Sequence, residues 1–187
     1  MSAGKPFPPA NPPASVVAAE ALGAATPAAA VDPHRLRQAL GRFATGVAIV
    51  TTLDARGQAL GLTINSFASL SLDPPLVLWS LRRASGCFDA FCAAPHFAIN
   101  VLAESQVDQS QLFASRCEHR FGASWQRGAH GLPLLEGAAA TFVCATDAHQ
   151  EAGDHELFIG RVLAMRESHV PPLLFYGGRY RRLGALV

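Results

Sequence analysis

The sequence has few cysteines, almost no excess charge of either sign and no long apolar run. Four cysteines among 187 residues are too few for a disulfide scaffold and fit an interior of reduced thiols. Lys and Arg number 15 against 14 acidic residues, and a net charge of +1 is too small to indicate binding to nucleic acid or acidic lipid. No stretch reaches the ~18 continuous apolar residues that span a bilayer. These absences predict a cytoplasmic protein with no nucleic acid and no membrane as partner.

Several well-known site motifs are also missing. The chain has no Walker-type loop and no GxGxxG spacing, so neither a P-loop nor a Rossmann dinucleotide site is predicted. It has no GxSxG, the nucleophile elbow of many hydrolases. Cys87 and Cys92, and the later run Cys117-Glu118-His119, lack both CxxC spacing and a paired second half. We therefore predict no metal site.

What is present indicates one folded domain with a tail. Half of the residues are hydrophobic and 16% are charged, and a compact chain of this size buries roughly 70% of its unfolded surface. Residues 1–32 differ, because they contain six prolines, many alanines and a single aromatic residue. Such a segment buries too little apolar surface to offset its ordering entropy, so we predict a disordered arm. A signal peptide is the alternative, which Glu20 and Pro27 disfavour.

Residues 33–187 read as a single domain in which strands outnumber helices. Asp32 and Pro33 are typical of a helix start, and Thr45-Gly46 is where this helix is expected to end. Two further short helices are expected at residues 86–93 and 106–115, and a long loop at residues 116–136. The expected strands are residues 47–52, 59–64, 76–81, 97–102, 138–146 and 156–165, with a last hairpin of residues 173–176 and 180–183. This order predicts a mostly β antiparallel barrel or sandwich rather than a doubly wound sheet.

The densest polar segment, residues 61–71, begins within the expected strand of residues 59–64 and lies just before Asp73-Pro74-Pro75. Strand alternation places Thr63 and Asn65 on one face and Ser66 on the other. Such side chains offer donors and acceptors to a flat polar ligand. A turn rich in side chain–backbone bonds explains the same residues equally well.

Two further segments carry polar groups next to an expected strand, one after its strand and one before it. Residues 80–86 hold two arginines and two serines before a short helix, which suits a phosphate group or, alternatively, a capped helix start. His155 opens the strand at residues 156–165, where it either contacts a ligand or has a structural role.

Five motifs then occur in order along the chain, and together they resemble one family. They are Thr45-Gly46-Val47-Ala48-Ile49-Val50-Thr51-Thr52, the polar segment from Gly61 to Pro75, Phe97-x-Ile99-Asn100-Val101-Leu102, Gly153-Asp154-His155, and Pro172-Leu173-Leu174-Phe175-Tyr176-x-Gly178-x-Tyr180. Over residues 33–184 the chain resembles the flavin reductases, the small reductase components of two-component flavin-dependent monooxygenases.

The resemblance implies a split β-barrel that binds FMN or FAD at the interface of a homodimer. It implies that NADH or NADPH transfers a hydride to flavin N5, and that the reduced flavin is supplied to a separate monooxygenase. Hydride transfer between two cofactors needs no protein nucleophile, in keeping with the lack of a catalytic triad. Two other activities remain open: reduction of ferric or other metal complexes through bound flavin, and flavin storage without catalysis.

The resemblance also implies which residues form the site. Those expected at the isoalloxazine edge or ribityl chain are Thr63, Asn65 and Ser66. Those expected near the phosphate are Ser80, Arg82 and Ser85. Further flavin contacts are expected from Asn100, Val101 and Leu102, with Tyr180 close to the site. His155 is expected where the nicotinamide stacks on the flavin, as the catalytic residue.

Overall fold

The computed structural model describes residues 31–114 and 121–185, and the chain divides into two units, residues 1–37 and 38–187. The predicted arm, residues 1–32, lies almost wholly outside the described residues. Helix α1 (Pro33–Leu40) begins as expected, because Asp32 Oδ1 accepts a hydrogen bond from the His34 N–H at 2.9 Å. The helix ends at Leu40, earlier than predicted, and Thr45–Gly46 forms the short strand β1.

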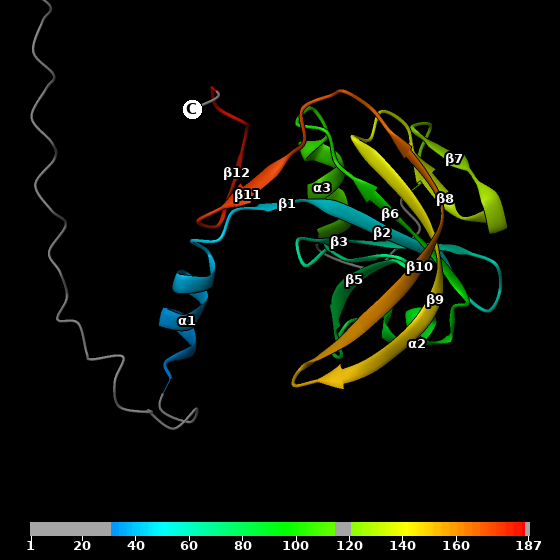
Figure 1. Ribbon diagram of the computed structural model, residues 1–187, viewed down its shortest axis with the longest axis horizontal. Helices are drawn as coiled ribbons and strands as arrows, with labels where there is room; N and C mark the ends of the chain where they lie inside the picture. Colours follow the sequence, from blue (N-terminus) through cyan, green and yellow to red (C-terminus); the bar gives the residue numbers. More distant parts are fainter. Residues whose placement is uncertain (1–30, 115–120, 186–187) are drawn as a thin grey trace, which may run out of the picture. The chain divides into compact units, whose positions relative to one another are not determined.

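The second unit is built on a seven-stranded antiparallel sheet in the order β3-β2-β6-β9-β10-β5-β4. Its strands are β2 (Ala48–Leu53), β3 (Ala59–Ile64), β4 (Ala68–Leu72), β5 (Pro75–Arg82), β6 (His96–Val101), β9 (Ala140–Ala152) and β10 (His155–Glu167). Figure 1 shows β9 and β10 as two long strands that run side by side. Every strand of this sheet pairs in an antiparallel sense, as the sequence predicted.

Two small sheets and the remaining helices complete the described fold. Strand β1 pairs with β11 (Leu174–Tyr176), which pairs with β12 (Arg179–Arg181). Strand β7 (Trp125–Arg127) pairs with β8 (Pro133–Leu135) around the 3₁₀ turn η2 (Ala129–Gly131). The helices are α2 (Phe88–Ala93) and α3 (Val107–Ala114). Within residues 31–114 and 121–185 the expectation of a mostly β fold with three short helices is confirmed. No described helix has the length and apolar character that crossing a bilayer requires.

The main core joins α2 to the sheet around Trp79, which is fully buried. The Trp79 ring stacks on Phe158 with centroids 4.5 Å apart and an interplanar angle of 12°. Phe91 of α2 and Phe97 of β6 meet the same indole edge-on, at 5.1 and 5.7 Å. Aromatic pairs in these geometries add stabilisation beyond their buried area.

Glycine at position 160 is what allows β10 to cross this core. A Cβ added there would overlap the Phe97 ring and lie 3.1 Å from Cys144 Cβ. The pairing register between β9 and β10 shifts at Ile159 and Gly160, which marks a bulge at the same point. Cys144 is itself buried, and desolvation raises the pKa of its thiol to about 12.

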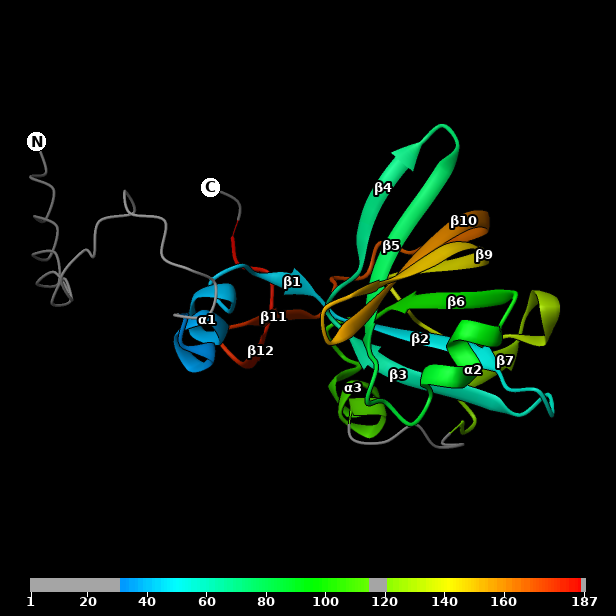
Figure 2. The same ribbon diagram turned by 90° about the horizontal axis from the view of Figure 1, so that it is seen from below.

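Three segments differ from the sequence prediction. Residues 68–72, expected as part of a polar connection, form β4, which pairs with β5; Figure 2 shows this hairpin extending away from the other strands. Residues 125–135, expected as loop, form the β7–β8 hairpin. Strands β9 and β10 reach 13 residues each, longer than expected. Residues 68–72 alternate apolar residues with serine, but this short run lies inside the polar segment that ends at Asp73-Pro74-Pro75 and was not separated from it. The exposed ends of β9 and β10 carry no regular apolar pattern, so periodicity did not reveal them.

Candidate functional site

A pocket of about 500 Å³ opens where β3, β5 and β10 come together. This volume lies within the range of about 300–1,000 Å³ that is common for small-molecule sites. Its lining is a mixture of polar and apolar side chains from four parts of the chain. Seven of the predicted site residues line it: Thr63, Asn65, Ser66, Ser80, Arg82, Ser85 and His155.

The pairing of β10 with β5 brings the two polar segments of the sequence together. His155 lies directly opposite Arg82 in this antiparallel ladder, and Leu157 lies opposite Ser80. Residues that face each other across a ladder project from the same side of the sheet. The imidazole of His155 and the guanidinium of Arg82 therefore face one pocket, although the sequence separates them widely.

Two hydroxyl groups of the pocket also hold its walls in place. Ser66 Oγ donates to the Ser80 carbonyl and accepts from the Ser80 N–H, both at 3.1 Å, which ties the end of β3 to β5. Thr63 Oγ1 donates to the Ser110 carbonyl at 2.7 Å and so ties β3 to α3. Asn65 lies between these anchored residues and is exposed, so its amide is presented to the pocket by a fixed backbone.

Helix α3 supplies part of the wall through Phe113 and Ala114, which sequence reasoning did not select. The helix lies beside β3 (Figure 2), and glycine at position 61 permits the approach. A Cβ on Gly61 would lie 3.1 Å from Phe113 Cε1. A phenylalanine at the end of an expected helix was the only available signal, and it is indistinguishable from an ordinary core position.

Four predicted site residues do not line this pocket. Asn100 is fully buried: its amide donates to the Ile49 carbonyl at 3.2 Å and accepts from the Leu135 N–H at 2.9 Å. Leu102 is fully buried in the second core cluster, and Val101 is half-buried. Tyr180 Oη lies 2.8 Å from Ser110 Oγ of α3, and Tyr180 does not line the pocket. A flavin contact from Asn100, Val101, Leu102 or Tyr180 stays a prediction.

His155 is held by its neighbour in sequence. Its Nδ1 lies 2.7 Å from Asp154 Oδ1. The hydrogen bond to His155, followed by the charge of that imidazole, holds the pKa of Asp154 below its usual value. An ionised carboxylate only accepts hydrogen bonds, so Nδ1 donates and Nε2 is left for a ligand.

The two arginines of the β5–α2 connection have different surroundings. Arg82 lines the pocket, together with Ser85 and Gly86. Arg83 does not line it and forms an ion pair with Glu151 of β9. The Arg83 N–H donates to the Asp154 carbonyl at 3.0 Å, which fixes the β9–β10 turn against the end of β5. Arg82 is therefore the arginine placed to bind an anionic group in the pocket.

Comparison with known proteins identifies relatives along most of the chain. Residues 40–184 match the family model described as "Flavin reductase like domain". The chain is 43% identical over 150 residues to stachydrine N-demethylase reductase subunit Stc3 of Rhizobium meliloti (strain 1021), covering 80% of this chain and 65% of that protein. It is 42% identical over 151 residues to the FMN reductase (NADH) SmoA of Agrobacterium fabrum, covering 81% of this chain and 86% of that protein.

Solved structures are similar in fold as well. The NADH:FAD oxidoreductase SgcE6 of Streptomyces globisporus, in complex with NAD and FAD fragments, superimposes with a TM-score of 0.77 at 37% identity. The match covers 82% of this chain and 96% of that one. The prediction of a split barrel like that of the flavin reductases is thereby confirmed. The chain spans about half to two thirds of the length of the first curated relatives it matches.

Proposed function

The chain belongs to the flavin reductase family, and on that basis we propose that it is an NAD(P)H-dependent flavin reductase that supplies reduced flavin to a separate monooxygenase. The observation that carries the proposal is the pocket between β3, β5 and β10. Seven polar residues line this pocket: six come from residues 63–66 and 80–85, and the seventh is His155. Its volume and its donors suit a flavin.

The residues of the pocket fit the chemical groups of a flavin nucleotide. Arg82 provides a permanent positive charge with several N–H donors, which suits a phosphate. The Asn65 amide provides both donor and acceptor for the polar edge of a ring or for ribityl hydroxyls. Leu62, Ile64 and Phe113 supply apolar surface for a ring face. A bound flavin accepts a hydride from the nicotinamide nucleotide, so these residues bind and orient rather than react.

His155 is the residue we assign to the nicotinamide. Asp154 fixes the hydrogen bond of Nδ1, which leaves Nε2 to hold a carboxamide or to balance developing negative charge. The proposed homodimer rests on the family resemblance and on the exposed apolar residues of β4 and β10, Leu70, Leu72, Leu163 and Met165. A cytoplasmic location is part of the same proposal, since that compartment supplies NADH and NADPH.

The proposal is tested by NAD(P)H oxidation with purified full-length protein, measured by nucleotide absorbance with and without added FMN or FAD. We expect oxidation that depends on added flavin and saturates with it. NADH is the first nucleotide to use, because two relatives are named for it. A bound yellow chromophore without any oxidation would instead indicate flavin storage. Rapid reduction of ferric chelates without free flavin would indicate the metal-complex reductase.

A second measurement isolates His155. The variant His155→Ala is expected to slow anaerobic single-turnover flavin reduction about 2–10-fold, the effect of losing one hydrogen bond. Flavin affinity is expected to change little, because Arg82, Asn65 and the hydroxyl groups remain. His169→Ala is the matched control, since His169 is exposed and does not line the pocket. An unchanged reduction rate in His155→Ala would remove His155 from the mechanism.

A further inference from the structure

A second cluster of reactive side chains lies outside the pocket. Cys92 lies in the last turn of α2, His149 on β9 and Glu156 on β10. One ligand atom from each residue lies within 4.8 Å of those of the other two. The proposed flavin reduction uses none of these three residues.

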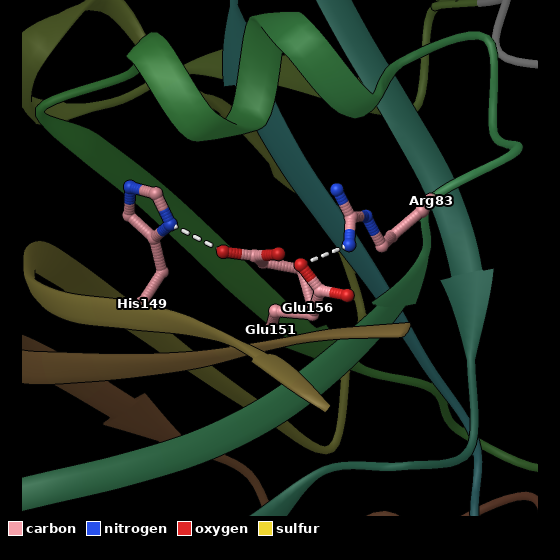
Figure 3. A network of polar contacts seen from close by, with 4 residues as sticks. All are labelled: Arg83, His149, Glu151 and Glu156. Atoms are coloured by element: carbon pink, nitrogen blue, oxygen red, sulfur yellow. Dashed lines mark hydrogen bonds and ion pairs between the residues drawn. The ribbon is translucent and has the colours of Figure 1, made fainter. Parts of the chain in front are cut away.

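Strand pairing explains how the histidine and the glutamate meet. His149 lies opposite Phe158, and Glu151 opposite Glu156, so these side chains project from one face of the β9–β10 hairpin. His149 and Glu156 are diagonal neighbours on that face, and Figure 3 shows them pointing toward each other. His149 Nδ1 lies 2.7 Å from Glu156 Oε1. His155, the residue next to Glu156, projects to the other face and lines the pocket.

Glu156 is an unusual residue for its surroundings. It is 7% exposed and lies on the same strand face as the core residue Phe158. Burying a carboxylate is costly unless a partner compensates its charge. The nearby cation Arg83 pairs with Glu151 instead, as Figure 3 shows. His149, whose side chain is 36% exposed, is the partner that the described residues give to Glu156.

The position of Cys92 does not suit a nucleophile. Burial, followed by the charges of Glu156 and Asp89, raises the pKa of its thiol, whereas Arg83 opposes the shift. Reactive cysteines have a lowered pKa and a positively charged environment. The geometry instead suits a shared cation, because one ligand atom of each residue lies within 4.8 Å of those of the other two.

We propose that Cys92, His149 and Glu156 bind a divalent transition metal ion of the zinc class, with water as the fourth ligand. Thiolate, imidazole and carboxylate are the three ligand types that zinc takes in proteins. The two anionic ligands neutralise the ion, so the complete site is uncharged, as a half-buried location requires. The metal would tie α2 to the β9–β10 hairpin on the face opposite the pocket.

The geometry is close to what tetrahedral coordination requires. Zinc bond lengths of about 2.0–2.3 Å place ligand atoms roughly 3.4–3.6 Å apart. The three atoms lie within 4.8 Å of one another, so small side-chain movements bring them to these separations. His149 is exposed and Cys92 is half-buried, so these two side chains have room to make the movements. Metal entry replaces the His149–Glu156 hydrogen bond by two metal bonds.

The test is a titration of the reduced full-length protein with Co²⁺ under anaerobic conditions. We expect one equivalent to produce a thiolate-to-cobalt charge-transfer band and the visible bands of tetrahedral cobalt, and Zn²⁺ to displace it. Cys92→Ser is expected to abolish the charge-transfer band. His149→Ala and Glu156→Gln are expected to weaken binding at least roughly 100-fold, since loss of even an outer-shell partner costs 10–100-fold.

Cys144→Ala is the matched control, because Cys144 is a free buried thiol outside the cluster. It is expected to retain both the band and the affinity. Circular dichroism of each variant without metal separates loss of binding from loss of fold. Because His149 is exposed, His149→Ala is the variant least expected to unfold the protein. Absence of the band in the native protein, or a band that survives Cys92→Ser with unchanged affinity, overturns the proposal. Cobalt binding that persists in all three variants indicates a site elsewhere and overturns it as well.

Discussion

Replacing Arg82 with alanine is expected to weaken FMN binding about 10–100-fold and to leave riboflavin binding nearly unchanged. Hydrogen bonds to a charged partner contribute about 1.5–3 kcal/mol, which corresponds to that loss. Riboflavin has the same ring and ribityl chain as FMN and lacks only the phosphate. Fluorescence titration with the two compounds therefore measures whether Arg82 recognises the phosphate.

Arg83→Ala provides the matched control for this experiment. It removes the same charge from the next position in the chain, but Arg83 lies outside the pocket and pairs with Glu151. We expect FMN affinity within about 2-fold of the native protein, since surface ion pairs contribute little. Equal losses in the two arginine variants, or equal losses for FMN and riboflavin in Arg82→Ala, would show that Arg82 acts through general charge or through folding.

Replacing Trp79 with alanine is expected to give the largest loss of stability of any prediction made for this chain. Truncation of a buried tryptophan costs about 3–5 kcal/mol, a large part of the 5–15 kcal/mol that stabilises a typical domain. At this chain length the melting temperature is expected to fall by roughly 6–20 °C. Thermal unfolding followed by circular dichroism measures the change.

Trp79→Phe tests whether the aromatic packing, rather than the volume alone, is responsible. Trp79 Nε1 is buried without a hydrogen-bond partner among the described residues, so the substitution removes no hydrogen bond. A phenylalanine keeps a ring for Phe158, Phe91 and Phe97 to contact. We expect its cost to be well below that of alanine. A melting temperature within 2 °C of native for Trp79→Ala would contradict the central position given to this indole.

The local sequence predicted most of the strands and the two polar segments that line the pocket. The run of β-branched residues before Asp54 and the returning residues 59–64 predict the β2–β3 hairpin, because both signals lie within one short stretch. The polar groups of residues 63–66 and 80–85 stand out against apolar neighbours, and family resemblance assigned them to a flavin. These segments line the pocket because each is the end of a strand whose position the apolar pattern fixes.

Other features could not be predicted from short stretches of the sequence. Strand β4 alternates serine with leucine over residues 69–72, but its leucines are exposed and the run lies inside the polar segment that ends at Pro75, so no local signal separates it from that segment. Asn100 lies in a family motif, yet the structure uses its amide to join β2 to β8. A buried amide satisfied by backbone and an amide that contacts a ligand look the same in the sequence, since both require the same residue type.

Composition and short-range pattern therefore determined the fold class, most strand positions and the polar segments of the pocket. Tertiary structure alone decided which distant groups meet. The β5–β10 register places His155 opposite Arg82, Gly160 leaves room for the Phe97 ring, and the β9–β10 hairpin beneath α2 brings Cys92 to His149 and Glu156. The physical reason is that periodicity reports which face of an element is buried, whereas contact between elements depends on register and packing over the whole sheet.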